Sequence, residues 1–448
     1  MLTIWGRHLR HCDGLGRRQF LRAGGLGLAG LTLADLLRSD ATAATPARRP
    51  KSIIYVVLSG GVSHIDSWDL KPDAPTEFRG DFKPIRTKVP GIDICEHFPR
   101  QAAIMDRLTL LRGVRSVEND HFLSEVYSGL PRTAGHRPAF GSVASKLLGG
   151  ESALPTYVSL NRPSGGMFDF EKPHYAGAAH APFCPFDEAV ENLKPAKDLA
   201  LLAERESLLH SFDTMRRNID KSGALDGLDR FQSQAFQMIA SSKVRDAFDV
   251  TREPEKVLAA YGHKAGKFSH QADINIRYDW DAKPFVMARR LVEAGVRAVT
   301  LSVGSWDHHS GAKQDIFGSY KLVFPVLDQS ICALVDDLKD RGLDQDVLVV
   351  VLGEFGRTPK VTYPGPGREH WADAGSMLFA GGGLQMGQVI GATDSRAERS
   401  KSGTMSFQNV MATLYGVLGV DLSRTLTDFN GRPQNILEDK IPIKELVG

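Results

Sequence analysis

The stretch that decides the fold is Ser52-Ile-Ile-Tyr-Val-Val-Leu-Ser59, which is followed directly by Gly60 and Gly61. It is a continuous run of mainly β-branched and aromatic side chains, apolar on both faces of an extended chain. A strand with two apolar faces is typical of a parallel sheet that helices cover on both sides. The sequence therefore predicts an α/β fold built around a buried strand at residues 52–59.

Further strands and helices alternate along the rest of the chain, and several of the strands end in a glycine-containing loop. We expect strands at residues 107–114, 157–160, 298–303, 347–352 and 377–380. We expect helices at residues 140–148, 285–294, 319–341 and 407–418. This alternation predicts a mostly parallel central sheet with helices on both faces. A charged segment at about 195–262, with spaced apolar residues, predicts an inserted layer of helices outside the sheet.

Histidines and carboxylates follow four of the predicted strands. Because functional groups gather beyond the carboxyl ends of parallel strands, we expect these side chains to meet at one edge of the sheet. Imidazole and carboxylate are ligands of divalent ions such as zinc and manganese, and nearby guanidinium groups could hold an anion. The residues concerned are His64, Asp66, Asn119, His121, Asp307, His308, His309, Glu354, Arg357, Arg368 and His370.

Each of these residues also has a structural interpretation. His64 or His121 could simply bond loop carbonyls, and Asp66 could cap the turn that follows it. The run Asp307-His308-His309 is harder to explain in this way, since three such side chains at a strand end are costly to bury without a partner. A metal site is the better interpretation of that run.

Five motifs in fixed order carry a family resemblance. They are GGVSHIDSWDLKPDAPTEFRGDFKPI (60–85), WDHH (306–309), GEFGRTPKV (353–361), GREHW (367–371) and FAGGGLQMGQVIGATD (379–394). From about residue 53 to 445 the chain resembles a secreted bacterial family named domain of unknown function 1501. That family is similar to the alkaline phosphatase and sulfatase superfamily, whose members hydrolyse or transfer phosphate and sulfate esters at metal sites. The resemblance implies an alkaline phosphatase-like fold and a divalent metal cofactor (zinc, manganese or calcium).

The resemblance also implies roles for single residues. Asp307, His309 and His370 look like ligands of one ion. Glu354 takes the place of a metal-binding aspartate and would be a further ligand or a general base. Phe355 stands where the superfamily has a histidine ligand.

Two departures from the superfamily concern its chemistry. Ser59 stands where the first strand should end in a ligand aspartate. The sulfatase nucleophile lies nine residues before a Thr-Gly pair, and counting back from Ser128 reaches Asn119, which is no nucleophile. We therefore expect one tightly bound ion and hydrolysis through activated water, with Glu354, His121 and Asn119 at the catalytic positions.

The first functional hypothesis is an exported metal-dependent hydrolase of sulfate or phosphate esters, which by family analogy could belong to a polysaccharide. Arg357, Arg368, His64 and Asp66 would then lie on the side of the site where substrate binds. The rival hypothesis is a non-catalytic exported binding protein on the same fold, favoured by the missing nucleophile, and a structural envelope component is a third. The Asp307, His309 and His370 set favours the enzyme.

The amino terminus predicts export. Arg17 and Arg18 precede Phe-Leu, a weakly apolar stretch follows, and Ala41-Thr-Ala43 offers a cleavage site. The arginine pair resembles a twin-arginine signal, whose partner is the twin-arginine translocase and whose destination is the periplasm or the exterior. We expect a signal at residues 1–43, a linker at 44–51 and one domain at 52–448.

Composition limits the remaining function classes. The formal net charge of +2 argues against a strongly basic nucleic-acid binder. No run of 18 apolar residues is present, so we expect no permanent membrane span. Cys95, Cys184 and Cys332 remain after the signal; they could form one disulfide at most and suggest no zinc-thiolate site.

Overall fold

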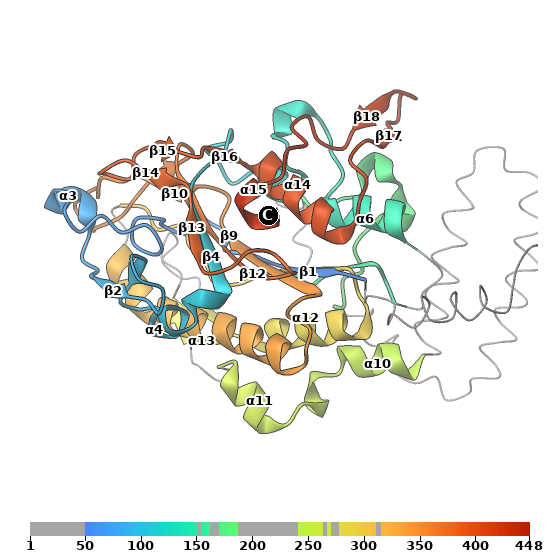
Figure 1. Ribbon diagram of the computed structural model, residues 1–448, viewed down its shortest axis with the longest axis horizontal. Helices are drawn as coiled ribbons and strands as arrows, with labels where there is room; N and C mark the ends of the chain where they lie inside the picture. Colours follow the sequence, from blue (N-terminus) through green and yellow to red (C-terminus); the bar gives the residue numbers. More distant parts are fainter. Residues whose placement is uncertain are drawn as a thin grey trace, which may run out of the picture. The chain divides into compact units, whose positions relative to one another are not determined.

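The computed structural model describes residues 50–149, 154–161, 170–186, 241–262, 267–269, 277–310 and 315–448. The predicted signal and most of the predicted helical insertion lie outside these residues. The described residues form an α/β fold around one large sheet (Figure 1).

The sheet has eight strands. In spatial order they are β13 (Gln388–Ile390), β4 (Leu108–Arg115), β12 (Gly375–Gly381), β9 (Val347–Leu352), β1 (Ser52–Val57), β8 (Ala298–Ser302) and β5 (Tyr157–Ser159), with β16 (Met405–Ser406) beside β4. The strand at residues 52–57 is central and fully buried, as its composition predicts. It runs parallel to both neighbours, with Ile54 opposite Val299 on one side and Val349 on the other.

One strand departs from the parallel pattern. β12 runs antiparallel to both β4 and β9, so the sheet is mostly, but not wholly, parallel. The carboxyl ends of β1, β4, β8 and β9 therefore share one edge with the beginning of β12 at Gly375. Residues just before β12 are brought to the same edge as residues that follow the other strands.

Helices cover both faces of the sheet, as Figure 1 shows. Ile54 and Val56 pack in a core with α12 (Lys283–Ala294) and α13 (Ile316–Asp340). The alternate residues Ile53, Tyr55 and Val57 point to the other face, into a core with α6 (Phe140–Leu148) and α14 (Phe407–Leu418). Because side chains alternate along a strand, one apolar run supplies two cores.

Local signals set where the covering helices begin. The Asp315 carboxylate accepts a hydrogen bond from the Gly318 N–H at 2.5 Å, so α13 begins three residues before the predicted start. Ser406 and Asn409 form a capping box at the start of α14. The predicted bounds of α6, α14 and β9 agree with the structure.

Shorter elements surround this framework. The helices are α3 (Thr76–Arg79), α4 (Pro99–Ala103), η1 (Met105–Arg107), α5 (Ser124–Ser128), η2 (Arg132–Ala134), η4 (His174–Ala176), η5 (Ala178–His180), α10 (Ser242–Phe248), η6 (Val250–Arg252), α11 (Glu255–Ala260) and α15 (Lys444–Val447). The strands form pairs: β2 (Pro84–Arg86) with β3 (Asp93–Cys95), β6 (Lys267–Ser269) with β7 (Arg277–Asp279), β10 (Gly356–Arg357) with β11 (His370–Trp371), β14 (Ala392–Thr393) with β15 (Ser400–Ser402), and β17 (Thr425–Thr427) with β18 (Pro433–Asn435).

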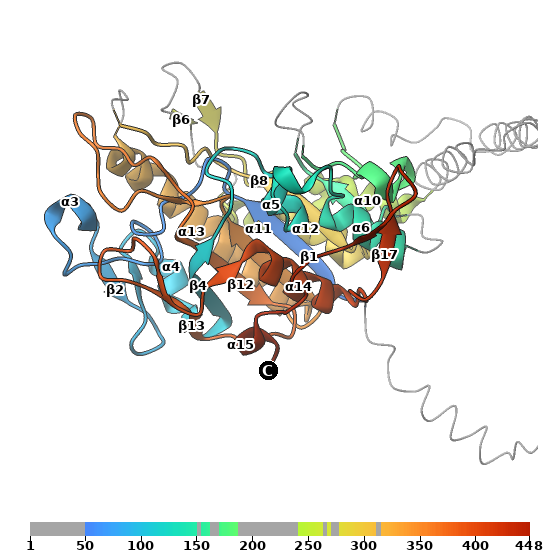
Figure 2. The ribbon, with the colours of Figure 1, turned by 90° about the horizontal axis from the view of Figure 1, so that it is seen from above.

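The described end of the predicted insertion is helical. α10 contacts α12 and α11 contacts α13, so both lie outside the layer that covers the sheet; Figure 1 shows them beneath it. Residues 195–240 lie outside the described part of the chain. In Figure 2, the view from above, α14 lies in front of the central sheet, and α12 and α13 lie behind it.

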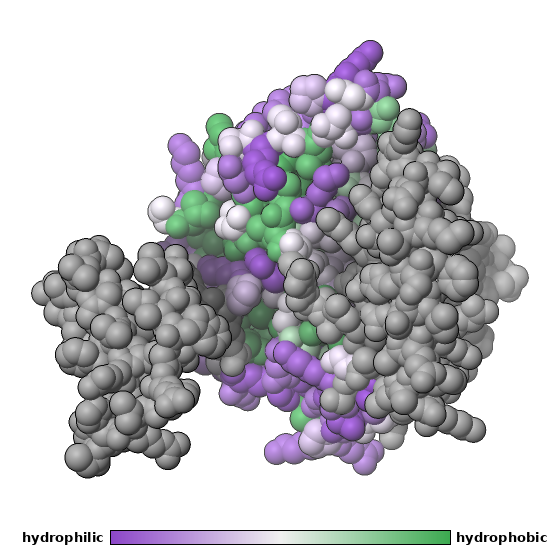
Figure 3. All heavy atoms as spheres, turned by 90° about the vertical axis from the view of Figure 1, so that its right-hand side faces the viewer, coloured by the Kyte–Doolittle hydropathy of each residue, from purple (hydrophilic) through white to green (hydrophobic). Residues whose placement is uncertain are grey.

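The surface and the cysteine thiols of the described residues add little to the functional interpretation. Among the described residues, no helix is both long enough and apolar enough to cross a membrane. Figure 3 shows one face on which hydrophobic side chains are bordered by hydrophilic ones. Cys95, Cys184 and Cys332, all within the described part, form no disulfide.

Candidate metal centre

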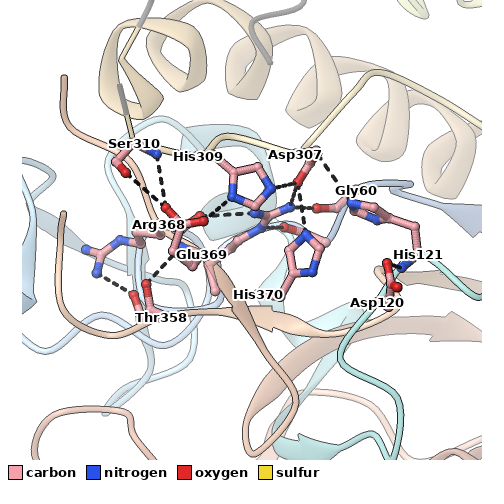
Figure 4. A network of polar contacts seen from close by, with 12 residues as sticks. Gly60, Asp120, His121, Asp307, His309, Ser310, Thr358, Arg368, Glu369 and His370 are labelled. Carbon is pink, nitrogen blue, oxygen red and sulfur yellow. Dashed lines mark hydrogen bonds and ion pairs between the residues drawn. The ribbon is translucent and has the colours of Figure 1, made fainter. Parts of the chain in front are cut away.

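Five loops meet at one edge of the sheet. They follow β1, β4, β8 and β9 or precede β12, and each contributes polar side chains to one network (Figure 4). The short ladder between β10 and β11 ties two of the loops together, because Arg357 lies opposite His370 in it. The predicted gathering of these loops at one edge is what the strand directions produce.

Alternation along the loop after β8 separates the three residues of the predicted cluster. Asp307 and His309 turn into the network, and His309 Nε2 lies 2.8 Å from Asp307 Oδ1. His308 points elsewhere: it is buried, and its ring packs edge-on against Tyr320 at 5.1 Å. Only the first and third residues of the run belong to the site.

Three imidazole rings converge on Asp307. His370 Nε2 lies 3.3 Å from its Oδ1, and His121 Nε2 lies 3.3 Å from its Oδ2. With His309, these residues offer one ligand atom each, all within 4.8 Å of one another. The structure thus brings together the predicted set of Asp307, His309 and His370 and adds His121 to it.

The other nitrogen of each ring has an acceptor of its own. His121 Nδ1 lies 2.9 Å from Glu354 Oε1, His309 Nδ1 contacts Glu369, and His370 Nδ1 lies 3.0 Å from the carbonyl oxygen of Asn119. Figure 4 shows His309 between Asp307 and Glu369. Since each acceptor takes a hydrogen bond from Nδ1, a ring that gives up one proton to bind an ion would keep the proton on Nδ1 and offer its lone pair on Nε2, on the side of Asp307. This is the arrangement of a metal site with oriented ligands.

The structure places Glu354 behind His121, on the side of the ring away from Asp307. Its side chain is 2% exposed, and its Oε1 and Oε2 accept the N–H groups of Gly60 and Gly61 at 2.7 and 3.1 Å. Successive N–H groups of this kind form an anion-binding nest. Both glycines have positive φ, 104° and 73°, which favours residues without a Cβ. Glu354 therefore accepts a hydrogen bond from Nδ1 of His121, and its oxygens are not among the four grouped ligand atoms.

The charges of the network shift its pKa values. Burial alone would lower the pKa of His121, but hydrogen bonds with Asp307 and Glu354 outweigh it and raise the pKa to about 9. The hydrogen bond with Asp307 likewise raises the pKa of His309. Burial would raise the pKa of Asp307, yet the three histidines and Arg357 hold it well below its usual range. The imidazoles thus face a carboxylate that stays ionised and attracts cations.

Arg357 supplies a fixed positive charge beside Asp307. Its side chain is 0% exposed, and its Nη2 lies 2.5 Å from Asp307 Oδ1. The other guanidinium contacts are with backbone carbonyls of Gly60, Gly61 and Arg368. These contacts do not fit the predicted substrate-binding role, since the guanidinium is enclosed by the protein.

Three more residues predicted to bind substrate are buried and engaged within the protein. Arg368 and Asp66 form an ion pair in which both side chains are 0% exposed. All five N–H groups of Arg368 have acceptors: Asp66 takes one from Nε and one from Nη2, and the carbonyls of Phe78, Thr358 and Pro359 take the rest. His64 is also 0% exposed and contacts the Ala397 carbonyl at 2.9 Å. None of the three has a group free to reach a ligand.

The departures from the superfamily pattern are visible in the structure. Asn119 is exposed, and it is its backbone carbonyl that holds His370. Ser59 Oγ pairs with Ser302 Oγ at 2.8 Å. The Phe355 ring is buried and packs against His370, with ring centroids 4.5 Å apart. At these positions the chain therefore has the amide of Asn119, the paired hydroxyl groups of Ser59 and Ser302, and the apolar ring of Phe355.

Sequence reasoning missed Glu369. Its carboxylate contacts His309, and its Oε1 also accepts hydrogen bonds from Ser310 N–H at 3.2 Å and Ser310 Oγ at 3.1 Å. The signal was present, because Glu369 directly precedes His370 in the GREHW motif. Glu369 is the residue directly before β11, so it and His370 reach the same network from neighbouring positions of one loop.

The grouped donors fit a divalent ion. Three imidazoles, once neutral, and one carboxylate are a ligand set for zinc or manganese. In each ring the Nδ1 atom lies against a carboxylate or carbonyl oxygen, which orients the ring. Calcium fits this set less well, since it takes six to eight oxygen ligands. Among the described residues, this is the one such group of His, Cys, Asp and Glu.

Fold and site together define an α/β protein with a mostly parallel central sheet and a candidate metal centre at one edge of that sheet. Over residues 50–447 the chain matches the family described as "Protein of unknown function (DUF1501)". The chain belongs to this family, as its motifs indicate. None of the curated proteins compared with the chain matches it.

Solved structures with a similar fold include a sulfatase, PsFucS1, from Pseudoalteromonas sp.; it is 10% identical, with 88% of this chain and 75% of that chain covered and a TM-score of 0.37. The lipoteichoic acid synthase LtaP from Listeria monocytogenes is 11% identical, with 84% and 73% covered and a TM-score of 0.35. An alkaline phosphatase from the Antarctic bacterium TAB5 is 10% identical, with 83% and 99% covered and a TM-score of 0.25.

Proposed function

We propose that this chain is a metal-dependent hydrolase of sulfate or phosphate esters that uses one divalent ion. His121, Asp307, His309 and His370 would hold the ion. The observation that carries the proposal is the orientation of the three rings, each with Nδ1 on an acceptor and Nε2 toward Asp307.

A divalent ion in such a site polarises an ester oxygen and makes water a better nucleophile near neutral pH. The residues of the chain do the positioning. Glu354 and Glu369 fix the tautomers of His121 and His309, and the Asn119 carbonyl fixes that of His370. Phe355 packs against His370 and His121 and keeps one side of the site apolar.

Hydrolysis would proceed by direct attack of water on the ester. Asn119 has no nucleophilic atom, and both carboxylate oxygens of Glu354 are engaged by backbone N–H groups. No covalent intermediate is therefore part of the proposal. The ester class rests on the family resemblance, and so does the particular alcohol, including a sugar of a polysaccharide.

The test has two parts. Elemental analysis of the purified chain should give about one zinc or manganese ion per molecule, and the chain should slowly hydrolyse aryl sulfates or aryl phosphates. Asp307→Ala should lose both the ion and the activity, because it removes the carboxylate on which the three rings converge. His136→Ala, which changes an exposed histidine outside the group, should keep both.

The rival is a binding protein that holds an ion without turnover. It is favoured by the absence of a side-chain nucleophile at Asn119. Full ion occupancy with no hydrolysis of any sulfate or phosphate ester would support the rival. Absence of any bound ion would contradict both.

Export by the twin-arginine translocase remains part of the proposal. It rests on the Arg17-Arg18 pair, the apolar stretch after it and the Ala-Thr-Ala sequence that ends at residue 43. A chain that folds and takes up its ion before transport suits this route. The destination would be the periplasm or the exterior.

A further inference from the structure

The guanidinium of Arg357 lies in a cage of oxygen atoms. Nη2 contacts Asp307 Oδ1 at 2.5 Å and the carbonyl of Gly60, Nε contacts the carbonyl of Gly61 at 2.9 Å, and Nη1 contacts the carbonyl of Arg368 at 3.0 Å. Carboxylate and carbonyl oxygens are also the ligands that hard metal cations prefer. The cage would suit a metal cation if the arginine side chain were absent.

Asp307 is shared between this cage and the candidate metal centre. Its Oδ1 contacts Arg357 Nη2 as well as His309 Nε2, while its Oδ2 faces His121 Nε2. The guanidinium is 0% exposed, so solvent does not screen its charge well. A second divalent ion beside Asp307 would have to lie next to this buried positive charge.

On the other side of the centre, within the part of the chain that the structure describes, lies the apolar ring of Phe355. The Phe355 ring lies 4.5 Å from the His370 ring and 5.5 Å from the His121 ring, centroid to centroid, and provides no ligand atom. Both further carboxylates that contact these histidines are engaged: Glu354 by His121 and two backbone N–H groups, and Glu369 by His309 and Ser310. A second ion would therefore have to compete with Arg357.

We infer that the Arg357 side chain takes the place of a second metal ion: it occupies the oxygen cage, holds Asp307 in position and limits the centre to one divalent ion. This inference rests on the proposed metal site. Arg357 is in this sense a positioning residue, since it acts through Asp307. Arginine suits the role because its guanidinium stays charged when buried and makes several directed hydrogen bonds at once.

Equilibrium dialysis with manganese(II) tests the inference on the full chain, because manganese accepts both imidazole and oxygen ligands. The wild type should bind about one ion per chain, as the single group of donors predicts. Arg357→Ala should bind about two, since the cage then accepts a hydrated cation. Millimolar guanidinium should return Arg357→Ala to one ion, whereas urea, which is similar in shape but neutral, should have no effect.

Arg297→Ala is the control. The Arg297 guanidinium also donates to backbone carbonyls, those of Lys51 and Leu418, but takes no part in the network around Asp307. Arg297→Ala should bind about one ion, with or without guanidinium, so the loss of an arginine side chain alone cannot imitate the expected result. One ion in Arg357→Ala, or two in the wild type, would overturn the inference.

Two further outcomes separate the inference from the proposal beneath it. If the wild type binds no manganese, the proposed metal site itself fails. If Arg357→Ala does not fold, Arg357→Lys keeps the buried positive charge and should bind about one ion like the wild type; two ions in this variant would overturn the inference.

Discussion

Glu354 lies 2.9 Å from Nδ1 of His121, on the side of the ring away from Asp307. A carboxylate that the family resemblance places among the metal ligands thus orients a histidine of the candidate metal centre. The first βα loop causes the difference, because the N–H groups of Gly60 and Gly61 hold both oxygens of Glu354. A bonded carboxylate behind a histidine makes the ring a more basic ligand.

The first prediction compares the two carboxylates that hold histidines. Glu354→Gln should weaken ion binding roughly 10- to 100-fold, because it removes the charge behind His121 and sets an amide N–H₂ against a backbone N–H. Glu369→Gln should weaken it less, since Glu369 is 43% exposed and Glu354 only 2%. Competition with a chromogenic chelator measures both affinities. Glu445→Gln, at an exposed position near the chain's end, is the control. Equal losses in the two site variants would contradict the ranking.

The second prediction concerns protons. In the ion-free chain the pKa of His121 is raised from 6.5 to about 9, so this ring is charged at pH 7. Ion binding requires a lone pair on Nε2 and must release that proton. Affinity should therefore rise by roughly tenfold per pH unit between pH 7 and 9, and level off above. In the ion-free chain, the same shift stabilises the fold below pH 6.5 and this stabilisation is lost as the pH rises through 9.

Calorimetry measures the released proton directly. The heat of zinc binding at pH 7 should differ between buffers of unlike ionisation enthalpy by an amount that corresponds to at least about one proton per ion. His121→Ala is the matched control for that proton, and His136→Ala should behave as the wild type. Heats independent of the buffer would show that the ring is neutral before the ion binds.

Much of the fold could be predicted from the sequence because buried strand and helix faces are visible in it as patterns of apolar residues. The strand at 52–57 is apolar at every position except its first, since each face of it meets a helical layer. The antiparallel direction of β12 has no such pattern in the sequence. An antiparallel strand inside a covered sheet is as apolar as a parallel one, so only pairing with β4 and β9 reveals it.

The site was predictable where ligands follow strand ends, and not where side-chain direction decides the role. Asp307 and His309 could be identified, because alternation on one extended segment turns both the same way. Arg368 could not: an arginine beside a metal motif and an arginine buried against Asp66 have the same sequence signature. The sequence shows which ionisable side chains are present, but packing decides which of them remain accessible to a ligand.

The third prediction concerns this buried ion pair. Asp66→Ala should destabilise the chain by about 3–5 kcal/mol, because it leaves the Arg368 guanidinium buried and uncompensated. The double change Asp66→Ala with Arg368→Met should recover part of the loss. Urea unfolding measures both. Ion content per folded chain should stay the same, and a loss of the ion without a loss of stability would assign the pair to the site.

The fourth prediction concerns export. Replacement of both Arg17 and Arg18 by lysine should leave the precursor unprocessed inside the cell, because the translocase reads the arginine pair. Cell fractionation and an immunoblot for the precursor and the shorter mature chain measure this. The same change at Arg48 and Arg49, in the linker after the expected cleavage site, is the control. Normal cleavage near Ala43 in the Arg17 and Arg18 variant would contradict the prediction.

The last prediction separates attack by water from covalent catalysis. Asn119→Ala should keep the ion and the rate of ester hydrolysis, because the backbone carbonyl that holds His370 is unchanged. Elemental analysis and steady-state assays with an aryl sulfate or an aryl phosphate measure both. Intact-mass spectra of acid-quenched wild type during turnover should show the unmodified chain alone, since neither Asn119 nor the enclosed Glu354 is placed to accept the ester group. A trapped phosphoryl or sulfuryl adduct would contradict direct attack by water and reveal a nucleophile elsewhere in the chain.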